Sequence, residues 1–69
     1  MAYAVFTNES VVVSQNGYSA TPRAGSVAAA TASSFDEAYD AANEQGGDRW
    51  VVVTDRKGAY VRSEYVPAV

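Results

Sequence analysis

The stretch RWVVVTDRKGAYVRSEYV, residues 49 to 66, predicts two antiparallel strands joined by a tight turn. Its central DRKG, residues 55 to 58, suits a type I turn with Gly58 in the left-handed position that follows it. This register pairs Val53 with Val61 and Val52 with Arg62, and alternate side chains then face opposite sides. One side is small and mostly aliphatic: Val51, Val53, Ala59, Val61 and Tyr65. The other side is amphipathic: Trp50, Val52, Thr54, Tyr60, Arg62 and Glu64. We expect a helix to cover the aliphatic side.

The helix is predicted within SSFDEAYDAANEQGG, residues 33 to 47. Ser34 and Glu37 have the spacing of a capping box, in which the serine oxygen accepts a first-turn N–H and the glutamate reaches back. An apolar stripe follows the helical repeat: Phe35, Ala38, Tyr39 and Ala42. Gly46 stands where many helices end in a left-handed residue. The segment therefore predicts an amphipathic helix that packs on a sheet.

Two further strands are predicted at residues 2 to 7 and 10 to 15, with a polar turn between them. In such a hairpin, Phe6 shares one face with Val11 and Val13. Tyr3, Val5 and Val12 then lie on the opposite face. We expect the Phe6 face to contact the helix.

Asn16-Gly17 follows, and it predicts a two-residue hairpin of type I′, because that turn needs positive φ at both central residues. The resulting register pairs Val13 with Ala20. Pro22 lacks an N–H for the ladder, so the third strand is expected to be an edge or to stop there. Residues 23 to 33 leave two interpretations open: a turn followed by a short strand at residues 27 to 31, or a flexible connector.

Composition points to a small mixed fold. The chain has 69 residues and contains no leucine, isoleucine or cysteine, so its apolar content is almost entirely valine, alanine and aromatic. Valine favours strands, whereas leucine is the usual filler of helical cores. We predict one α+β domain over residues 1–69, with an antiparallel sheet of four to six strands and one α-helix packed on one face.

Few side chains are available for catalysis. The absence of histidine and cysteine excludes an imidazole base, a thiol nucleophile and the usual zinc ligands. Asp36 and Asp40 form a carboxylate pair at i, i+4, but exposed helix faces commonly carry such pairs. We expect no catalytic, metal or cofactor-binding residues, and the chain is not predicted to be an enzyme.

The face opposite the predicted helix is the candidate binding site. Its residues are Tyr3, Val5, Val12, Trp50, Val52, Tyr60 and Arg62. An apolar patch on a small domain commonly marks an interface, and Trp, Tyr and Arg are enriched at binding hot spots. We expect a protein-interaction module that binds a protein partner or forms a homodimer. The alternative is a module that stacks single-stranded nucleic acid on the same face, although the net charge of −3 supplies little positive field.

Location is suggested by the lack of long apolar segments. No apolar run approaches the roughly 20 residues of a membrane-spanning helix. The start, MAYAVFTNES, has neither the basic residues nor the apolar core of a secretory signal. We expect a cytoplasmic protein of prokaryotic or viral origin that does not bind membranes.

The pieces NGYSA, SSFDEAYDAANEQGG and RWVVVTDRKGAYVRSEY together resemble a family of short prokaryotic proteins of unknown function. That family has a Gly-aromatic hairpin, one helix and a valine-rich C-terminal hairpin. The chain departs from it in the longer linker TPRAGSVAAATA and in Trp50. The layout is also similar to small bacteriophage inhibitors of host enzymes such as RNA polymerase. The resemblance implies a compact α+β unit that functions by binding.

Overall fold

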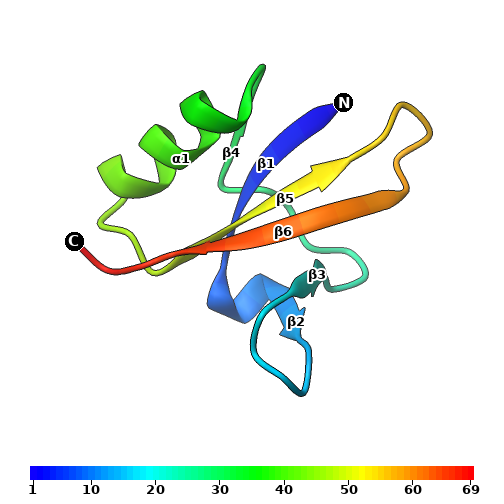
Figure 1. Ribbon diagram of the computed structural model, residues 1–69, viewed down its shortest axis with the longest axis horizontal. Helices are drawn as coiled ribbons and strands as arrows, with labels where there is room; N and C mark the ends of the chain where they lie inside the picture. Colours follow the sequence, from blue (N-terminus) through cyan, green and yellow to red (C-terminus); the bar gives the residue numbers. More distant parts are fainter.

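The main sheet has four antiparallel strands in the order β4-β1-β5-β6, and the helix α1 lies across one of its faces (Figure 1). The computed structural model describes all residues from 1 to 69. The elements are β1 (Ala2–Thr7), β4 (Ala30–Ala32), α1 (Phe35–Glu44), β5 (Arg49–Thr54) and β6 (Tyr60–Val66). The predicted α+β layout, with one helix on one face of an antiparallel sheet, is confirmed. No helix has the length and apolar character needed to cross a membrane.

A second, two-stranded sheet packs on the other face of the main sheet. After β1 the chain makes the 3-10 turn η1 (Asn8–Ser10) and continues into the antiparallel pair β2 (Val11–Val13) and β3 (Ala20–Pro22). The backbone N–H of Ala20 donates to the Oγ of Ser63 on β6 at 2.8 Å. The main sheet is therefore covered on both faces, which the sequence patterning did not indicate.

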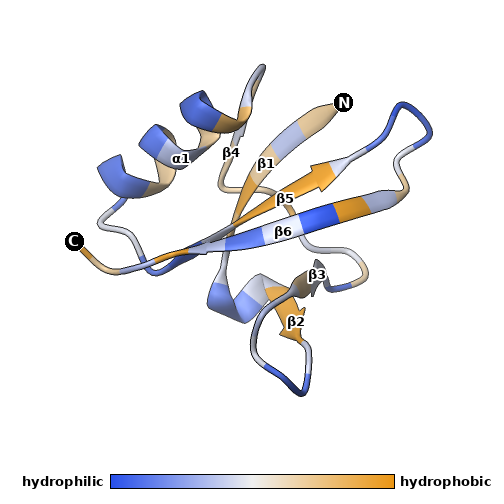
Figure 2. Ribbon diagram, in the orientation of Figure 1, coloured by the Kyte–Doolittle hydropathy of each residue, from blue (hydrophilic) through white to orange (hydrophobic).

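The helix begins at the predicted cap. The Oγ of Ser34 accepts the backbone N–H of Glu37 at 3.2 Å. The Glu37 carboxylate reaches back one residue further than a capping box requires, and it accepts the hydroxyl of Ser33 at 2.9 Å. Figure 2 shows hydrophilic residues on the outer side of α1, where Asp36 and Asp40 are exposed.

The helix ends at the predicted glycine. Gly46 and Gly47 both have positive φ, at 96° and 72°, and their N–H groups donate to the carbonyls of Asn43 and Ala42. This pair of bonds is the Schellman motif, which satisfies carbonyl groups that the helix leaves free. The N–H of Val69 then donates to the Gly46 carbonyl at 3.1 Å, so the C-terminal tail lies against the end of the helix.

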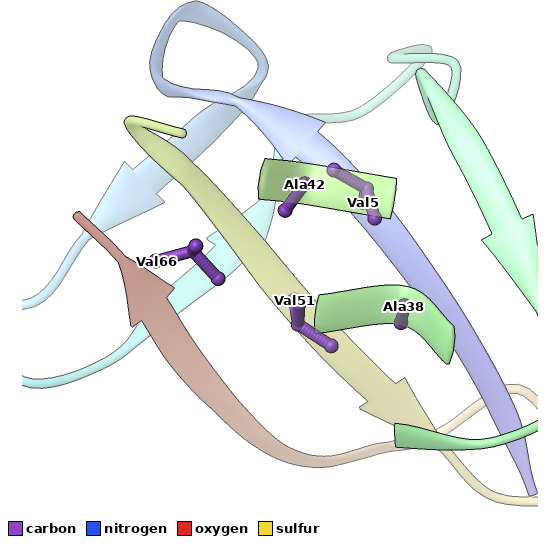
Figure 3. Packing of buried hydrophobic residues seen from close by; sticks show 5 residues of the cluster. All are labelled: Val5, Ala38, Ala42, Val51 and Val66. Carbon is purple, nitrogen blue, oxygen red and sulfur yellow. The ribbon is translucent and has the colours of Figure 1, made fainter. Parts of the chain in front are cut away.

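Small side chains allow α1 to approach the sheet closely. Ala38 and Ala42 of the predicted stripe are buried against Val5 of β1, Val51 of β5 and Val66 of β6 (Figure 3). Each fully buried valine contributes about 1.5–3 kcal/mol relative to an exposed one. This cluster is the core on the helix side of the sheet.

A second cluster fills the space between the main sheet and the β2–β3 hairpin. Its buried members are Phe6, Val11, Ala20, Trp50 and Val52. Strand β5 therefore contributes side chains to both clusters. The run Trp50-Val51-Val52-Val53 lacks polar alternation because a strand with two covered faces has no solvent side.

The predicted partner of β1 was wrong. β1 pairs with β4 and β5 rather than with β2, because η1 turns the chain out of the main sheet before β2 begins. The two faces of β1 are consequently the reverse of the prediction. Val5 packs under the helix, whereas Phe6 packs beside Trp50.

The predicted register of the C-terminal hairpin holds only near its turn. Asp55 N–H donates to the Ala59 carbonyl and Gly58 has φ of 82°, as the type I turn requires. A β-bulge lies between Val53 and Thr54 of β5, where the pairing changes from Thr54–Tyr60 to Val53–Arg62. The extra residue on β6 moves every later side chain to the other face. Val53 therefore faces Arg62 and not Val61.

The predicted N-terminal turn has the right register and the wrong type. Val13 pairs with Ala20 as expected. Asn16 does not have positive φ, since Asp48 is the only non-glycine residue that does. The Asn16 side chain instead accepts the N–H of Tyr18 at 2.9 Å, and the hairpin closes through Ser14 N–H and the Ser19 carbonyl. The loop therefore has four residues and is not a type I′ turn.

Residues 23 to 33 contain both a turn and a strand. The N–H of Ser26 donates to the carbonyl of Arg23 across the predicted turn at Ala24-Gly25. The strand that follows is β4, which begins at Ala30 rather than at Val27. The interpretation as a strand is confirmed over that of a flexible connector, with its bounds displaced toward the helix.

Candidate functional site

Four of the seven predicted binding residues do not lie on an exposed face. Tyr3 and Val5 pack on the helix side of the sheet, and Val5 is fully buried. Trp50 and Val52 lie beneath the β2–β3 hairpin with 3% and 1% of their surface exposed. The expectation of one exposed apolar face is wrong, because the hairpin that we placed within the main sheet covers that face instead.

The other three predicted residues are exposed but separate. Val12 on β2 is 50% exposed and Tyr60 on β6 is 42% exposed. Arg62 lies on the helix side of β6, where its guanidinium stands 4.6 Å from the ring centroid of Phe35. The bulge accounts for this last placement, since it puts Arg62 on the face opposite Trp50.

Trp50 is held by specific contacts within the domain. Its Nε1 donates to the Oδ1 of Asn8 at 2.9 Å, and its ring lies 5.2 Å from that of Tyr65. The indole N–H thus has an acceptor within the domain, and the indole ring has an aromatic neighbour there. Trp50 is a core residue that joins η1 to the C-terminal hairpin.

Asp48 connects the same elements through its carboxylate. Its Oδ1 accepts the hydroxyl of Tyr65 and the Nδ2 of Asn8, the latter at 2.7 Å. These hydrogen bonds, the first from Tyr65 and the second from Asn8, lower the pKa of Asp48 below its ordinary value, and the nearby charge of Arg49 adds to the effect. The bond to Asp48 in turn raises the pKa of Tyr65. The backbone of Asp48 has φ of 55°, which a non-glycine residue rarely adopts.

Strand β6 is the exposed edge of the main sheet. Its one neighbour in the sheet is β5, and it is the longest strand in the chain. Its exposed residues are Tyr60, Val61, Arg62, Glu64 and Tyr65. An edge of this length and composition offers unpaired backbone groups together with aromatic and β-branched side chains.

The direction of the free backbone groups follows from the ladder. The carbonyl of Val5 accepts the N–H of Ala29 and so points toward β4. Its partner Val51 on β5 therefore points toward β6, because antiparallel residues alternate between bonded and non-bonded pairs. Val51 pairs with Glu64, so the N–H and C=O groups of Ser63 point away from β5, toward the open edge.

Charged side chains flank this position on one face. Arg62 and Glu64 both lie on the helix side of β6, one on each side of Ser63. The sequence interpretation placed the same two residues beside Trp50 and left Ser63 out of the site. The signal that was available is the pair of charged residues within YVRSEYV, because charged side chains are common on edge strands.

No pocket is present, and no three His, Cys, Asp or Glu side chains are grouped to hold a metal ion. The candidate recognition surface is the β6 edge, which we define as the outward backbone groups and exposed side chains of residues 60 to 65. No protein-family model, no curated protein and no solved structure matches this chain.

Proposed function

We propose that the chain is a non-catalytic protein-interaction module that binds an extended segment of a protein along the β6 edge. The carrying observation is that the longest strand has one neighbour only and turns the N–H and C=O of Ser63 away from that neighbour. Addition of a strand to such an edge supplies main-chain hydrogen bonds, and the flanking side chains supply selectivity. Tyr60, Val61 and Tyr65 would contact alternate residues of the added segment.

A protein segment suits this edge better than single-stranded nucleic acid. Base stacking requires accessible aromatic rings and a positive groove. Trp50 is 3% exposed, and the chain carries a net charge of −3. A peptide needs neither, because its backbone bonds to the strand directly.

The test screens a library of random short peptides for binding to the intact chain. Hydrogen exchange at the Ser63 and Tyr65 amides then locates the bound peptides, because these amides point away from β5 and an added strand would pair with them. We expect protection of both amides in the complex. Peptides that bind without protecting them would contradict the proposal.

A pair of substitutions at one position separates backbone pairing from side-chain contact. Ser63→Pro removes the outward N–H, and an edge strand tolerates proline where the N–H faces solvent. Ser63→Ala keeps that N–H while also losing the Oγ that binds Ala20. We expect Ser63→Pro to abolish peptide binding and Ser63→Ala to retain it. Equal binding by the two variants would show that the edge backbone is not used.

A further inference from the structure

The residues of β6 have a nearly symmetric order about Ser63. Arg62 precedes Ser63 and Glu64 follows it, while Val61 and Tyr65 stand two residues away on either side. When two copies of a strand pair antiparallel around a two-fold axis at Ser63, each residue before Ser63 meets one that follows it in the other copy. Arg62 then lies opposite Glu64, and Val61 lies near Tyr65.

We infer that the protein segment bound by the β6 edge is β6 of a second copy of this chain. The inference rests on the proposed function, since it names the occupant of the same edge. The two main sheets would join at Ser63 into one continuous eight-stranded sheet. A two-fold contact of this kind uses one surface on both subunits.

The backbone meets the first requirement of such a contact. The N–H and C=O of Ser63 point outward, so two copies of Ser63 exchange both hydrogen bonds across the axis. Arg62 and Glu64 direct their backbone groups toward β5 and form non-bonded pairs across the new interface. Side chains approach most closely in such pairs.

Charge selects the register. With the axis at Ser63, two Arg62–Glu64 pairs form on the helix side of the joined sheet. With the axis at Glu64 or at Arg62, like charges lie directly opposite each other, which is destabilising. Opposite charges directly across a strand pair are favourable. The edge therefore favours pairing with its own copy around Ser63 and disfavours the two registers that are shifted by one residue.

The bulge limits the length of the pairing. Val61 is the extra residue opposite Val53, so the regular hydrogen-bonding pattern on β6 is interrupted there. The contact is therefore short, and we expect a weak dimer whose population rises with concentration. Sedimentation equilibrium from micromolar to millimolar concentration measures that association directly.

The decisive experiment exchanges the charges in two separate variants. Arg62→Glu alone and Glu64→Arg alone each place like charges opposite each other twice, and each should weaken self-association by about tenfold or more. In an equimolar mixture every cross-strand pair is again of opposite sign, so a heterodimer should form with close to the wild-type Kd. Circular dichroism melting checks that each variant is folded. Arg62→Glu loses its contact to Phe35 and could fail to fold for that reason. In that case the self-association of Ser63→Pro is compared with that of Ser63→Ala, which tests the same interface.

The outcomes separate this inference from the proposed function. A wild-type chain that stays monomeric at millimolar concentration, yet binds peptides in a manner sensitive to Ser63→Pro, overturns the homodimer and leaves strand binding in place. A dimer that responds neither to charge exchange nor to Ser63→Pro shows that copies associate through another surface and overturns the inference. Restoration of the dimer in the mixture supports it.

Discussion

The hydroxyl of Tyr65 donates a hydrogen bond to the carboxylate of Asp48, and so ties the edge strand β6 to the loop between α1 and β5. Asn8 donates to the same carboxylate from η1 and accepts the indole N–H of Trp50. One carboxylate thus joins three segments that are distant in sequence. The ionised carboxylate is the stronger acceptor of both bonds.

Stability should therefore depend on pH through Asp48. The folded-state pKa of Asp48 is lowered from 3.8, so its contribution is present above that value and is lost as pH falls through the folded-state pKa. The folded-state pKa of Tyr65 is raised from 10.0, so its contribution is present below that value and is lost as pH rises through the folded-state pKa. Melting temperatures of wild type and Asp48→Asn, from neutral to strongly acidic pH, measure the first effect. The melting temperature of Asp48→Asn should fall less in acid than that of wild type. If the two proteins lose stability equally in acid, Asp48 is not the group responsible for the acid dependence.

The N-cap of α1 provides a second prediction. Ser34→Ala removes the acceptor for the Glu37 N–H and should cost about 1 kcal/mol of unfolding free energy. Ser33→Ala removes an exposed hydroxyl bond to the Glu37 side chain and should cost less. Urea unfolding of the two variants gives the comparison. An equal or larger loss at Ser33 would mean that the helix cap is one residue earlier.

The two glycines after the helix should differ in their tolerance of a side chain. A Cβ at Gly46 meets no atom within 4 Å, so Gly46→Ala costs only the strain of its positive φ, about 1–2 kcal/mol. A Cβ at Gly47 would overlap the carbonyl oxygen of Pro67 in the backbone of the C-terminal tail. Gly47→Ala should therefore destabilise the fold more than Gly46→Ala. Thermal melting of both variants checks this order, and similar melting temperatures would show that the tail does not lie over Gly47.

Trp50 should behave as a core residue even in the monomer. Trp50→Ala removes a buried indole and should cost about 3–5 kcal/mol, which is enough to unfold many domains of this size. Val12→Ala, at a half-exposed position of the β2–β3 hairpin, should change stability by about 0.5 kcal/mol or less. Tryptophan emission of dilute wild-type protein should be that of a buried indole. Emission typical of exposed tryptophan at low concentration would contradict the position of Trp50 beneath the hairpin.

Local structure was predictable because each signal depends on a few adjacent residues. The cap at Ser34, the glycine end at Gly46 and the turn before Gly58 all arise from hydrogen bonds within a few positions. The four-residue loop at Asn16 keeps the expected pairing of Val13 with Ala20. One residue on each side of the two-residue turn joins the loop, so the register of the strands does not change. The predicted helix stripe likewise needed only the 3.6-residue repeat.

The partners of each strand were less predictable, because they depend on contacts between distant segments. Alternation within β1 identifies two faces and does not say which one the helix covers. The sequence of the turn does not predict the bulge opposite Val53, yet the bulge puts Arg62 and Tyr65 on the faces opposite to those expected. Trp50 and Val52 therefore belong to a buried cluster, and the exposed aromatic side chains of this hairpin lie on the edge strand β6.

The central position of β1 makes the sheet depend on a pairing between distant segments. Ala2 pairs with Thr54 and Thr7 with Arg49, so β1 is completed by β5, which is distant from it in the sequence. Before β5 pairs, β1 has only the three residues of β4 as a partner in the sheet. Such distant pairings slow folding relative to helical domains of similar size. We therefore expect formation of the β1–β5 pair to limit the folding rate.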